Sequence, residues 1–220
     1  MFIALVPAYN EEKTIGSVVG SLLGYVDEVV VIDDGSRDMT IDRAIEAGAT
    51  VLVHNINRGQ GAALETGHQY ARDNQADMVI HFDADGQFDP KEITEARIAL
   101  QESGADILFG SRFLQKKSSI PFFKKNVLLP IARLVDGVFG SLKLSDAHNG
   151  FRMLTKHALS QIYISQDRMA HASEIPQIVL QKKLSYIEYP VTVIYHEYGQ
   201  SASGGIKILK DLLIAKCIRK

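Results

Sequence analysis

The chain has 220 residues, 46% of them hydrophobic, a net charge of −2 and one cysteine, Cys217. This composition can bury the core of one domain, and a single cysteine excludes an intrachain disulfide and fits a reducing compartment. No stretch reaches the ~18 uncharged apolar residues of a spanning helix, and Met1 to Ala8 lacks a signal peptide's basic leader, so we expect a cytoplasmic protein, peripheral at most on the inner face of a membrane.

Strand-like and helix-like segments alternate through the first half of the chain. Apolar runs typical of strands occur at 2–8, 28–33, 50–55, 78–83 and 106–110. Helix-like segments lie between them, at about 11–23, 39–48, 60–74 and 90–103. Asn10 is placed to cap the first helix, and Pro90 to take the first position of the fourth. The alternation predicts an α/β fold with a mostly parallel sheet flanked by helices.

The pattern changes after residue 111. A basic loop leads into a largely apolar helix, and further strands and helices follow a polar loop at 145–150. The expected elements are helices near 124–140, 156–164, 171–183 and 206–220, strands at 151–155 and 186–195, and a Gly/Ser loop at 199–205. We expect residues 1–220 to form a single domain, with 1–110 and 111–220 as two functional halves.

Charge is distributed unevenly between these halves. Residues 1–105 hold 18 acidic and 7 basic side chains, whereas residues 106–220 hold 8 acidic and 17 basic ones. An acidic half suits metal binding, and a basic half suits an anionic partner. The basic segment from Lys116 to Lys125, next to an apolar helix, suits an anionic membrane surface, and its alternative is a solvated loop. We expect no nucleic acid partner.

The segment Asp83-Ala84-Asp85-Gly86-Gln87 is the most informative in the chain. It follows an apolar run at 78–82, and strand alternation would place Asp83, Asp85 and Gln87 on one side of the loop. Two carboxylates and an amide oxygen repel one another unless a cation lies between them. Mg²⁺ or Mn²⁺ suits such ligands and commonly binds substrate phosphates as well.

Two other interpretations of this segment exist. Asp and Gly are common in ordinary strand-to-loop turns. Asp-x-Asp-Gly also resembles a phosphatase signature in which an aspartate is the nucleophile. That signature usually follows the first strand and continues with Thr or Val, whereas here the segment follows the fourth strand and continues with Gln87.

Other polar segments also follow strands, and ligands of such sheets bind beyond the carboxyl ends of the strands. The first strand is not followed by Gly-x-Gly-x-x-Gly, so a nicotinamide or flavin cofactor is not expected. Tyr9 can instead pack against a base, Glu11 can hydrogen-bond its edge, and Asp34 can accept hydrogen bonds from a base or ribose. Each could also be an ordinary helix-start or turn residue.

Five segments together resemble family 2 glycosyltransferases with the Rossmann-like GT-A fold. Within that family the chain is most similar to the branch of dolichyl-phosphate mannose synthases and polyprenyl-phosphate glycosyltransferases. The resemblance covers nearly the whole chain and rests on Pro7-Ala8-Tyr9-Asn10-Glu11-Glu12, Asp33-Asp34-Gly35-Ser36, Asn57-Arg58-Gly59-Gln60-Gly61, Asp83-Ala84-Asp85-Gly86-Gln87 and Gly110-Ser111-Arg112-Phe113.

The resemblance implies roles on the donor side. Asp83 would contact the ribose or the sugar, and Asp85 and Gln87 would bind a metal that bridges the diphosphate. The residues implied to hold the nucleoside are Pro7, Tyr9, Glu11 and Asp34, and those of a loop close to the donor are Asn57, Gly59 and Gly61.

On the acceptor side, the resemblance implies that Arg112 faces the reacting groups and that Arg152, in Asn149-Gly150-Phe151-Arg152, binds an acceptor phosphate. Guanidinium groups suit this task because they meet phosphate oxygens in a bidentate manner. Glu174 would be a general base, a sugar contact or only a favourable charge at a helix start. The chain departs from the branch at His196, where an arginine is usual, and in lacking a lysine after Gly199-Gln200-Ser201.

The expected function is inverting, metal-dependent transfer of a sugar from a GDP- or UDP-linked donor to a polyprenyl-phosphate-type lipid. Two alternatives remain. The acceptor could be a saccharide hydroxyl in cell-surface polysaccharide synthesis, or the chain could bind sugar nucleotides without turnover.

Overall fold

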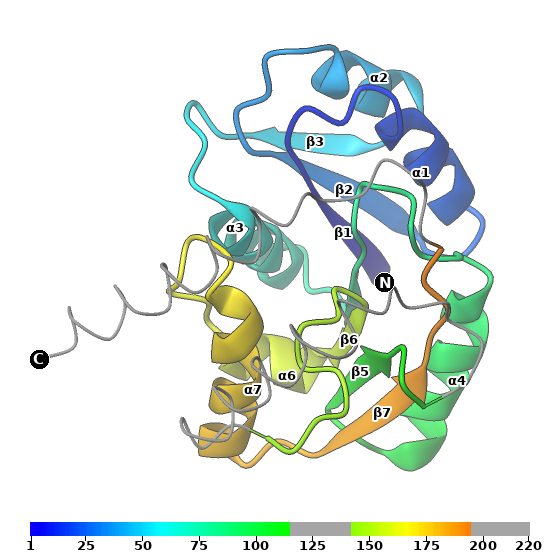
Figure 1. The fold of residues 1–220 in the computed structure, drawn as a ribbon, viewed down its shortest axis with the longest axis vertical. Helices are drawn as coiled ribbons and strands as arrows, with labels where there is room; N and C mark the ends of the chain where they lie inside the picture. Colours follow the sequence, from blue (N-terminus) through cyan, green and yellow to red (C-terminus); the bar gives the residue numbers. More distant parts are fainter. Residues whose placement is uncertain (115–141, 195–220) are drawn as a thin grey trace, which may run out of the picture.

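The computed structural model describes residues 1–114 and 142–194, and within them a single seven-stranded sheet lies between two layers of helices (Figure 1). The strands are β1 (Phe2–Ala8), β2 (Glu28–Asp33), β3 (Thr50–Val53), β4 (Met78–His81), β5 (Ile107–Ser111), β6 (Arg152–Thr155) and β7 (Tyr186–Pro190). The helices are α1 (Ile15–Leu22), α2 (Thr40–Glu46), α3 (Gln60–Asp73), α4 (Glu92–Ser103), α6 (Lys156–Gln161) and α7 (His171–Lys182).

The strand order is β3-β2-β1-β4-β6-β5-β7. The chain builds outward from β1 to β2 and β3, and then crosses to the other side of β1 to place β4. The point where the direction reverses, between β1 and β4, is where ligands of such sheets bind. The expected mostly parallel sheet is confirmed.

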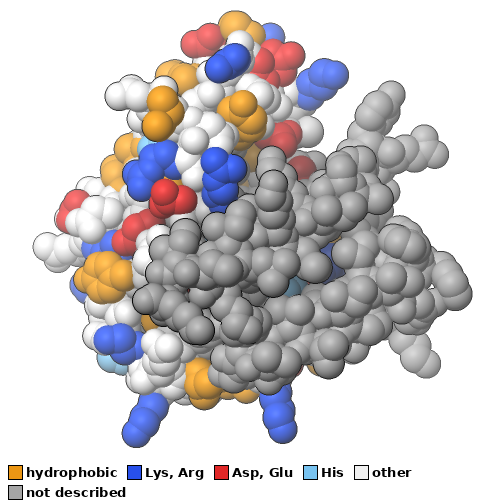
Figure 2. Space-filling view, turned by 60° about the vertical axis from the view of Figure 1, so that its left-hand side comes forward, with side chains coloured by type: hydrophobic (Ala, Val, Ile, Leu, Met, Phe, Trp, Pro, Cys, Tyr) orange, Lys and Arg blue, Asp and Glu red, His pale blue; other side chains and the backbone are white. Residues whose placement is uncertain are grey.

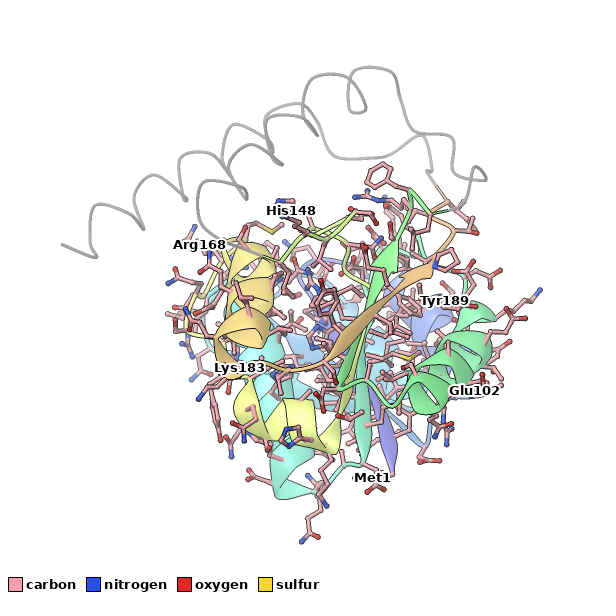
Figure 3. The ribbon with its side chains drawn as sticks, turned by 90° about the horizontal axis from the view of Figure 1, so that it is seen from below. Met1, Glu102, His148, Arg168, Lys183 and Tyr189 are labelled. Carbon is pink, nitrogen blue, oxygen red and sulfur yellow. The ribbon has the colours of Figure 1, made fainter. Side chains whose placement is uncertain are left out.

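Strand β6 is the exception, because it runs antiparallel to both β4 and β5. Its first residue, Arg152, pairs with His81 at the end of β4 and with Phe109 near the end of β5. The amino end of β6 therefore lies at the edge formed by the carboxyl ends of β4 and β5. Figure 3 shows that His148, from the loop before β6, and Arg168 lie at the end of the molecule opposite Met1, where β1 begins.

Each face of the sheet is covered by its own hydrophobic core. One core joins the sheet to α1, α2 and α4, and the other joins it to α3, α6 and α7. Alternate residues of a strand supply the two cores: Ala4 and Val6 belong to the first, and Ile3 and Leu5 to the second, all four fully buried. Burial on both faces explains why these strands are continuous hydrophobic runs.

The expected start of the first helix is wrong by several residues. Helix α1 begins at Ile15, and Asn10 does not cap it. Asn10 instead has a positive φ of 56°, which asparagine tolerates better than most residues, and its side-chain oxygen accepts a hydrogen bond from the Arg37 N–H. A separate turn follows, in which the Glu11 carbonyl accepts hydrogen bonds from the N–H groups of Thr14 and Ile15.

Other boundaries also differ from expectation. Helix α4 begins at Glu92, so Pro90 lies in the turn before it rather than at its first position. Strand β4 ends at His81, and the orientation of Asp83 and Asp85 is therefore set by a loop and not by strand alternation. Strand β7 ends at Pro190, but Val193 still bridges to Phe88, and Ile194 donates its N–H to the Gln87 carbonyl.

Several expectations fall outside the described residues. They are the helices at 124–140 and 206–220, the loop at 199–205, the basic segment from Lys116 to Lys125, and His196. In the part that is described, every helix is too short or too polar to cross a bilayer. On the described part of the face in Figure 2, acidic and basic side chains lie interspersed, with hydrophobic ones between them.

A pair of buried histidines lies under the carboxyl edge. His68 of α3 and His81 of β4 approach to 2.7 Å between their Nε2 atoms, so one ring donates and the other accepts. Burial is the main cause that lowers the pKa of both, to about 3 for His68 and well below the ordinary value for His81. The positive charges of Arg72 near His68 and of Arg152 near His81 act in the same direction. Both rings are therefore neutral in the folded protein.

This pair predicts acid sensitivity. Below pH 6.5 the unfolded chain binds protons on these histidines while the folded protein does not, so stability present above pH 6.5 is lost as the pH falls towards 3. The loss is at most about 1.4 kcal/mol per pH unit for each histidine. We expect thermal unfolding of a His68→Leu/His81→Leu variant to depend less on pH between 7 and 5 than that of the wild type. Exposed His157→Leu is the control, and equal pH dependence in all three proteins would contradict the prediction.

Candidate active site

The loop after β4 presents two carboxylates at the switch point of the sheet. Gly86 has a φ of 71°, which permits the tight turn, and the Asp85 Oδ1 atom accepts the Gln87 N–H at 3.0 Å. Asp83 is partly buried, and its Oδ1 accepts a hydrogen bond of 3.1 Å from the Gln60 side chain at the start of α3. Asp83, Asp85 and Gln87 thus share one short loop, and their convergence on one side of it stays a prediction.

The two carboxylates repel each other. Burial, followed by the negative charge of Asp85, raises the pKa of Asp83 from 3.8 to about 6. Arg152, the hydrogen bond from Gln60 and Arg112 act in the opposite direction. A group with this pKa is ionised at neutral pH, but at an electrostatic cost that a cation would relieve.

Gly150 lies directly behind Asp83. A Cβ atom at Gly150 would lie 2.2 Å from the Asp83 Oδ2 atom and 2.7 Å from its Cγ, closer than non-bonded atoms approach. Only glycine leaves room for this carboxylate. The loop before β6 therefore forms one wall of the site, although it is more than 60 residues from Asp83 in the sequence.

The loop chemistry fits a divalent cation held partly by substrate. Among residues 1–114 and 142–194, no group of three His, Cys, Asp or Glu side chains is arranged to enclose a metal by itself. Mg²⁺-type ions commonly bind one or two protein carboxylates and take further ligands from phosphates. Two mutually repelling carboxylates with an amide neighbour, Gln87, match that arrangement.

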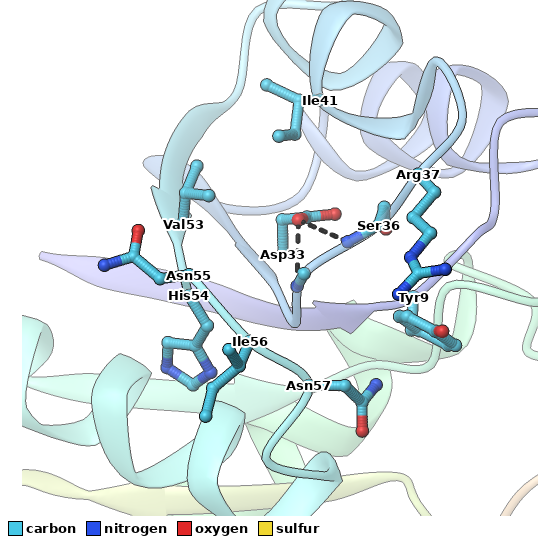
Figure 4. A pocket seen from close by; sticks show the side chains of 11 residues that line it. Tyr9, Asp33, Ser36, Arg37, Ile41, Val53, His54, Asn55, Ile56 and Asn57 are labelled. Atoms are coloured by element: carbon cyan, nitrogen blue, oxygen red, sulfur yellow. Dashed lines mark hydrogen bonds between the residues drawn. The ribbon is translucent and has the colours of Figure 1, made fainter.

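A pocket of about 410 Å³ opens on the other side of β1 (Figure 4). Its lining includes Tyr9, which was expected at the nucleoside and is 45% exposed, and Asn57, which was expected in a loop close to the donor. The remaining lining residues are Asp33, Gly35, Ser36, Arg37, Ile41, Val53, His54, Asn55 and Ile56. The pocket is large enough for a nucleoside, and the exposed ring of Tyr9 offers a flat surface for a base.

The two neighbouring aspartates at the end of β2 accept hydrogen bonds from different loops beside this pocket. The Asp33 Oδ2 atom accepts the N–H groups of Gly35 and Ser36, drawn as dashed lines in Figure 4, while its buried Oδ1 has no hydrogen-bond partner in the described chain. Asp34 instead holds the next loop: its oxygens accept the N–H groups of Arg58 and Gly59 and contact His54 Nδ1 at 2.8 Å. A direct contact of Asp34 with the nucleoside stays a prediction.

Pro7 and Glu11 lie at the end of β1. Pro7 is a partly buried residue of the strand itself. Glu11 accepts a hydrogen bond from the Thr14 hydroxyl, and burial, with smaller contributions from the charges of Asp85 and Asp38, raises its pKa. The influence of Asp85 shows that the segment after β1 and the acidic loop after β4 face each other across the switch point.

The glycines after β3 are needed because another loop lies against them. Gly59 has a φ of 105°, and a Cβ there would lie 2.6 Å from the Asp167 carbonyl oxygen. At Gly61 a Cβ would lie 1.9 Å from the Gln166 carbonyl oxygen. The Asp167 carbonyl also accepts the Ala62 N–H at 3.0 Å. The turn at residues 59–61 is thus packed against residues 166–167.

Glu174 supports that packing. Its carboxylate accepts hydrogen bonds from the hydroxyl and N–H of Ser165 and from the N–H of Gln166, the last at 2.9 Å. The residue lies in the first turn of α7, as expected. These contacts give it a structural task in addition to the base, sugar-contact and helix-charge roles considered from the sequence.

Arg112 makes a bidentate ion pair with Asp146. Its Nε and Nη2 atoms donate to the two carboxylate oxygens, each at 2.7 Å, and its backbone N–H donates to Oδ2 at 3.1 Å. Asp146 is 4% exposed. Burial by itself would raise the pKa of Asp146, but the hydrogen bonds and charge of Arg112 outweigh it and hold the pKa below the ordinary value.

Arg152 is buried, at 1% exposed. Its Nη2 donates to the Ala147 carbonyl at 3.2 Å, and its Nε lacks a hydrogen-bond partner among the residues described. Burial lowers its pKa to about 10, while the charges of Asp83 and Asp146 act to raise it. The structure therefore places Arg152 beneath Asp83, as a positive charge that keeps this carboxylate ionised. A contact with an acceptor phosphate stays a prediction.

The sequence interpretation missed several residues of the site. Gln60 and Gly150 belong to motifs of the family resemblance, but nothing in those motifs indicated that both residues lie against Asp83. Asp146 carried a weak signal, as an acid in a basic region before Gly-Phe-Arg. Asp33 and His54 have no feature in the sequence that distinguishes them from their neighbours.

A pocket at the carboxyl ends of β1 to β3, and an acidic loop at the switch point of a mostly parallel sheet, are features of an α/β enzyme that binds its ligand at this edge. Residues 3–163 match the family described as "Glycosyl transferase family 2". The chain is 35% identical over 224 residues to an uncharacterized protein of Methanocaldococcus jannaschii, covering 96% of this chain and 90% of that one. It is 30% identical over 238 residues to the UDP-N-acetylglucosamine–dolichyl-phosphate N-acetylglucosaminyltransferase of Methanococcus voltae, covering 96% and 94%.

A solved structure shares the fold. Glucosyl-3-phosphoglycerate synthase from Mycobacterium tuberculosis, in complex with Mn²⁺, uridine diphosphate and glucosyl-3-phosphoglycerate, superimposes with a TM-score of 0.74 at 19% identity, covering 97% of this chain and 78% of that one. The chain belongs to glycosyl transferase family 2. It is a glycosyltransferase of the hexosyltransferase type with the GT-A fold, and the resemblance noted from the motifs is confirmed.

Proposed function

We propose that the protein transfers a sugar, with inversion and with the help of a divalent metal, from a nucleotide sugar to a polyprenyl-phosphate-type lipid. The main support for the proposal is that groups of opposite charge lie at the same edge of the sheet. The carboxylates of Asp83 and Asp85 lie there, and Arg112 and Arg152 act on Asp83 from the β5 and β6 side. A divalent cation that binds the donor diphosphate would fit the acidic side, and an anionic acceptor would fit the basic side.

The donor is a nucleotide sugar whose nucleoside occupies the pocket lined by Tyr9 and Asn57. The name of the Methanococcus voltae relative supports a UDP-linked donor, and a GDP-linked one is the alternative. Asp34 holds the turn that carries Gly59, and that turn, which includes Gly61, would lie close to the donor. Pro7 and Glu11 complete the nucleoside side from the end of β1.

Asp85 and Gln87 would hold a Mg²⁺ or Mn²⁺ ion. When bound, such an ion supplies positive charge to the diphosphate that leaves. Asp83, which is held by Gln60 and limited by the loop at Gly150, would contact the ribose or the sugar. The Mn²⁺ and uridine diphosphate bound to the structurally similar synthase support this assignment.

The reaction is one in-line displacement. An acceptor oxygen forms a bond to the anomeric carbon while the bond from that carbon to the diphosphate oxygen breaks, and the nucleoside diphosphate departs. A phosphate acceptor has a second pKa of ~6 and is largely ionised at neutral pH, so it needs positioning and no general base. Arg112, held by Asp146, is suited to position it.

Glu174 distinguishes the two acceptor classes. Because its carboxylate holds the N–H groups of Ser165 and Gln166, we expect Glu174→Gln to loosen the loop against Gly61. With a phosphate acceptor, kcat should fall less than about tenfold while the KM for the donor rises, because no proton has to be removed. A loss of about 10²–10⁴-fold in kcat, the usual contribution of a general base, would instead favour a saccharide hydroxyl as the acceptor.

A turnover assay tests the proposed function. The purified protein is incubated with UDP- and GDP-linked sugars, Mn²⁺ or EDTA, and farnesyl phosphate, a short polyprenyl phosphate. Metal-dependent formation of a glycosylated lipid phosphate supports the proposal. Transfer only to saccharides supports the polysaccharide alternative, and metal-dependent binding of a donor without any turnover supports a binding module.

A further inference from the structure

We propose that Asp146 is a positioning residue, which fixes the guanidinium of Arg112 in the orientation that meets the acceptor phosphate. The inference rests on the function proposed above. It assigns a task in the reaction to a residue of the loop before β6 that the motifs did not indicate.

The geometry of the pair supports this assignment. The two 2.7 Å contacts use the Nε and Nη2 atoms of Arg112, so its Nη1 atom is turned away from Asp146. A two-point contact between planar groups also fixes the plane of the guanidinium, which one hydrogen bond would leave free to rotate. The contact of the Arg112 N–H with the same carboxylate fixes the start of the side chain as well.

Asp146 is itself held from several sides. The Asn149 side chain donates to its Oδ2 at 3.1 Å. The neighbouring Ser145 donates its N–H and hydroxyl to Glu188 of β7, at 2.7 and 2.6 Å, and its hydroxyl lies 2.6 Å from that of Ser111 at the end of β5. The loop is thus fastened to two strands. Such support is what a residue needs in order to hold another within a fraction of an ångström.

The charges on this side also suit the assignment. Arg112 and Arg152 carry two positive charges, and Asp146 neutralises one of them. Asp83 and Asp146 both act on Arg152, and the buried Asp146 carboxylate offsets the repulsion between the two arginines. An Asn at position 146 would keep one acceptor atom but lose the charge and the second contact to the guanidinium.

Asp146→Asn is the variant that tests the proposal, with farnesyl phosphate as acceptor and the nucleotide sugar that gives turnover as donor. We expect kcat/KM for farnesyl phosphate to fall about 10- to 100-fold, the range for a group misplaced by about 1 Å, with the donor KM within twofold of wild type. Asp146→Glu should recover part of the loss. The control is Asp106→Asn, because Asp106 also accepts hydrogen bonds from a loop serine, Ser185, but at the opposite edge of the sheet.

A double-mutant cycle separates positioning from a structural role. If Asp146 acts through Arg112, adding Asp146→Asn to Arg112→Lys should cause little further loss. Additive losses, or a donor KM that changes as much as the acceptor KM, would overturn the proposal.

A second measurement of the positioning role needs no substrate. The NMR signal of the Arg112 Nε–H, assigned with Arg112→Lys, should exchange slowly with water in the wild type and fast in Asp146→Asn. Equally fast exchange in both proteins would refute the positioning role of Asp146 without contradicting the proposed function. A protected Nε–H in a wild-type protein that transfers no sugar would refute the proposed function, and with it the acceptor role of the pair.

Discussion

Replacing Asp85 by alanine is expected to lower the rate of sugar transfer by about 10³-fold, the upper range for the loss of one group that stabilises a developing charge. Asp85 is the carboxylate of the acidic loop proposed to bind the metal. Its removal would take away a negative charge that we propose holds a cation at the diphosphate. The change should also abolish the difference in donor affinity between Mn²⁺ and EDTA.

The rate and affinity are measured with the nucleotide sugar that gives turnover, by product formation and by calorimetric titration. Asp89→Asn is the matched control, because Asp89 lies in the same loop but its carboxylate accepts the Lys91 N–H in the turn before α4. An Asp85→Ala protein that retains more than a tenth of the activity would show that the acidic loop is an ordinary turn.

The second large effect is expected at Gly150. An alanine there would place its Cβ 2.2 Å from the Asp83 Oδ2 atom, so the carboxylate must move. A displacement of about 1 Å at a reacting centre can cost about 10²-fold in rate, and we expect a loss of that size. The same displacement should weaken donor binding, because Asp83 is proposed to contact the ribose or the sugar.

Gly20→Ala in α1 is the matched control, since a Cβ at that position meets no atom within 4 Å. It should leave turnover unchanged and tend to stabilise its helix. Thermal unfolding of both variants checks that Gly150→Ala is folded. Turnover of a folded Gly150→Ala protein within threefold of wild type would mean that Asp83 does not need its place against the β6 loop.

The parts of the fold that follow from hydrophobic periodicity were predictable. Strands β1 and β2 and helix α7 match their expected ranges to within one residue, because buried runs and amphipathic repeats are local features of the sequence. The acidic loop after β4 was also predictable, since Asp83, Asp85 and Gln87 lie within five residues.

Other contacts of the site join residues that lie far apart in the sequence. Hydrophobic periodicity is a local pattern and does not reveal such contacts. Asp146 lies 34 residues from Arg112, and they meet only because β6 enters the sheet antiparallel between β4 and β5. The same insertion places Gly150 behind Asp83 and buries Arg152 beneath it.

Local geometry explains the remaining differences. Asn10 has the residue type of a helix cap, but its oxygen is used by Arg37, and α1 begins five residues later. Of the two adjacent aspartates after β2, the sequence favoured Asp34 at the nucleoside. In the structure Asp34 holds the Gly59 turn, and the atom without a partner in the described chain belongs to Asp33, in the lining of the pocket.

Asp83 therefore links the two proposed sides of the site. Gln60 at the start of α3 donates a hydrogen bond to this carboxylate, Gly150 in the loop before β6 limits its position, and Arg152 acts on it as a counter-charge.

Product analysis with a polyprenyl phosphate tests this account most directly. The wild-type protein is incubated with a panel of nucleotide sugars, Mn²⁺ and farnesyl phosphate, and the organic extract is examined by mass spectrometry and NMR. The account predicts one sugar joined to the lipid phosphate, with the anomeric configuration opposite to that of the donor, and no product in EDTA. A product of retained configuration, equal yield in EDTA, or sugar attached only to a hydroxyl acceptor would contradict it.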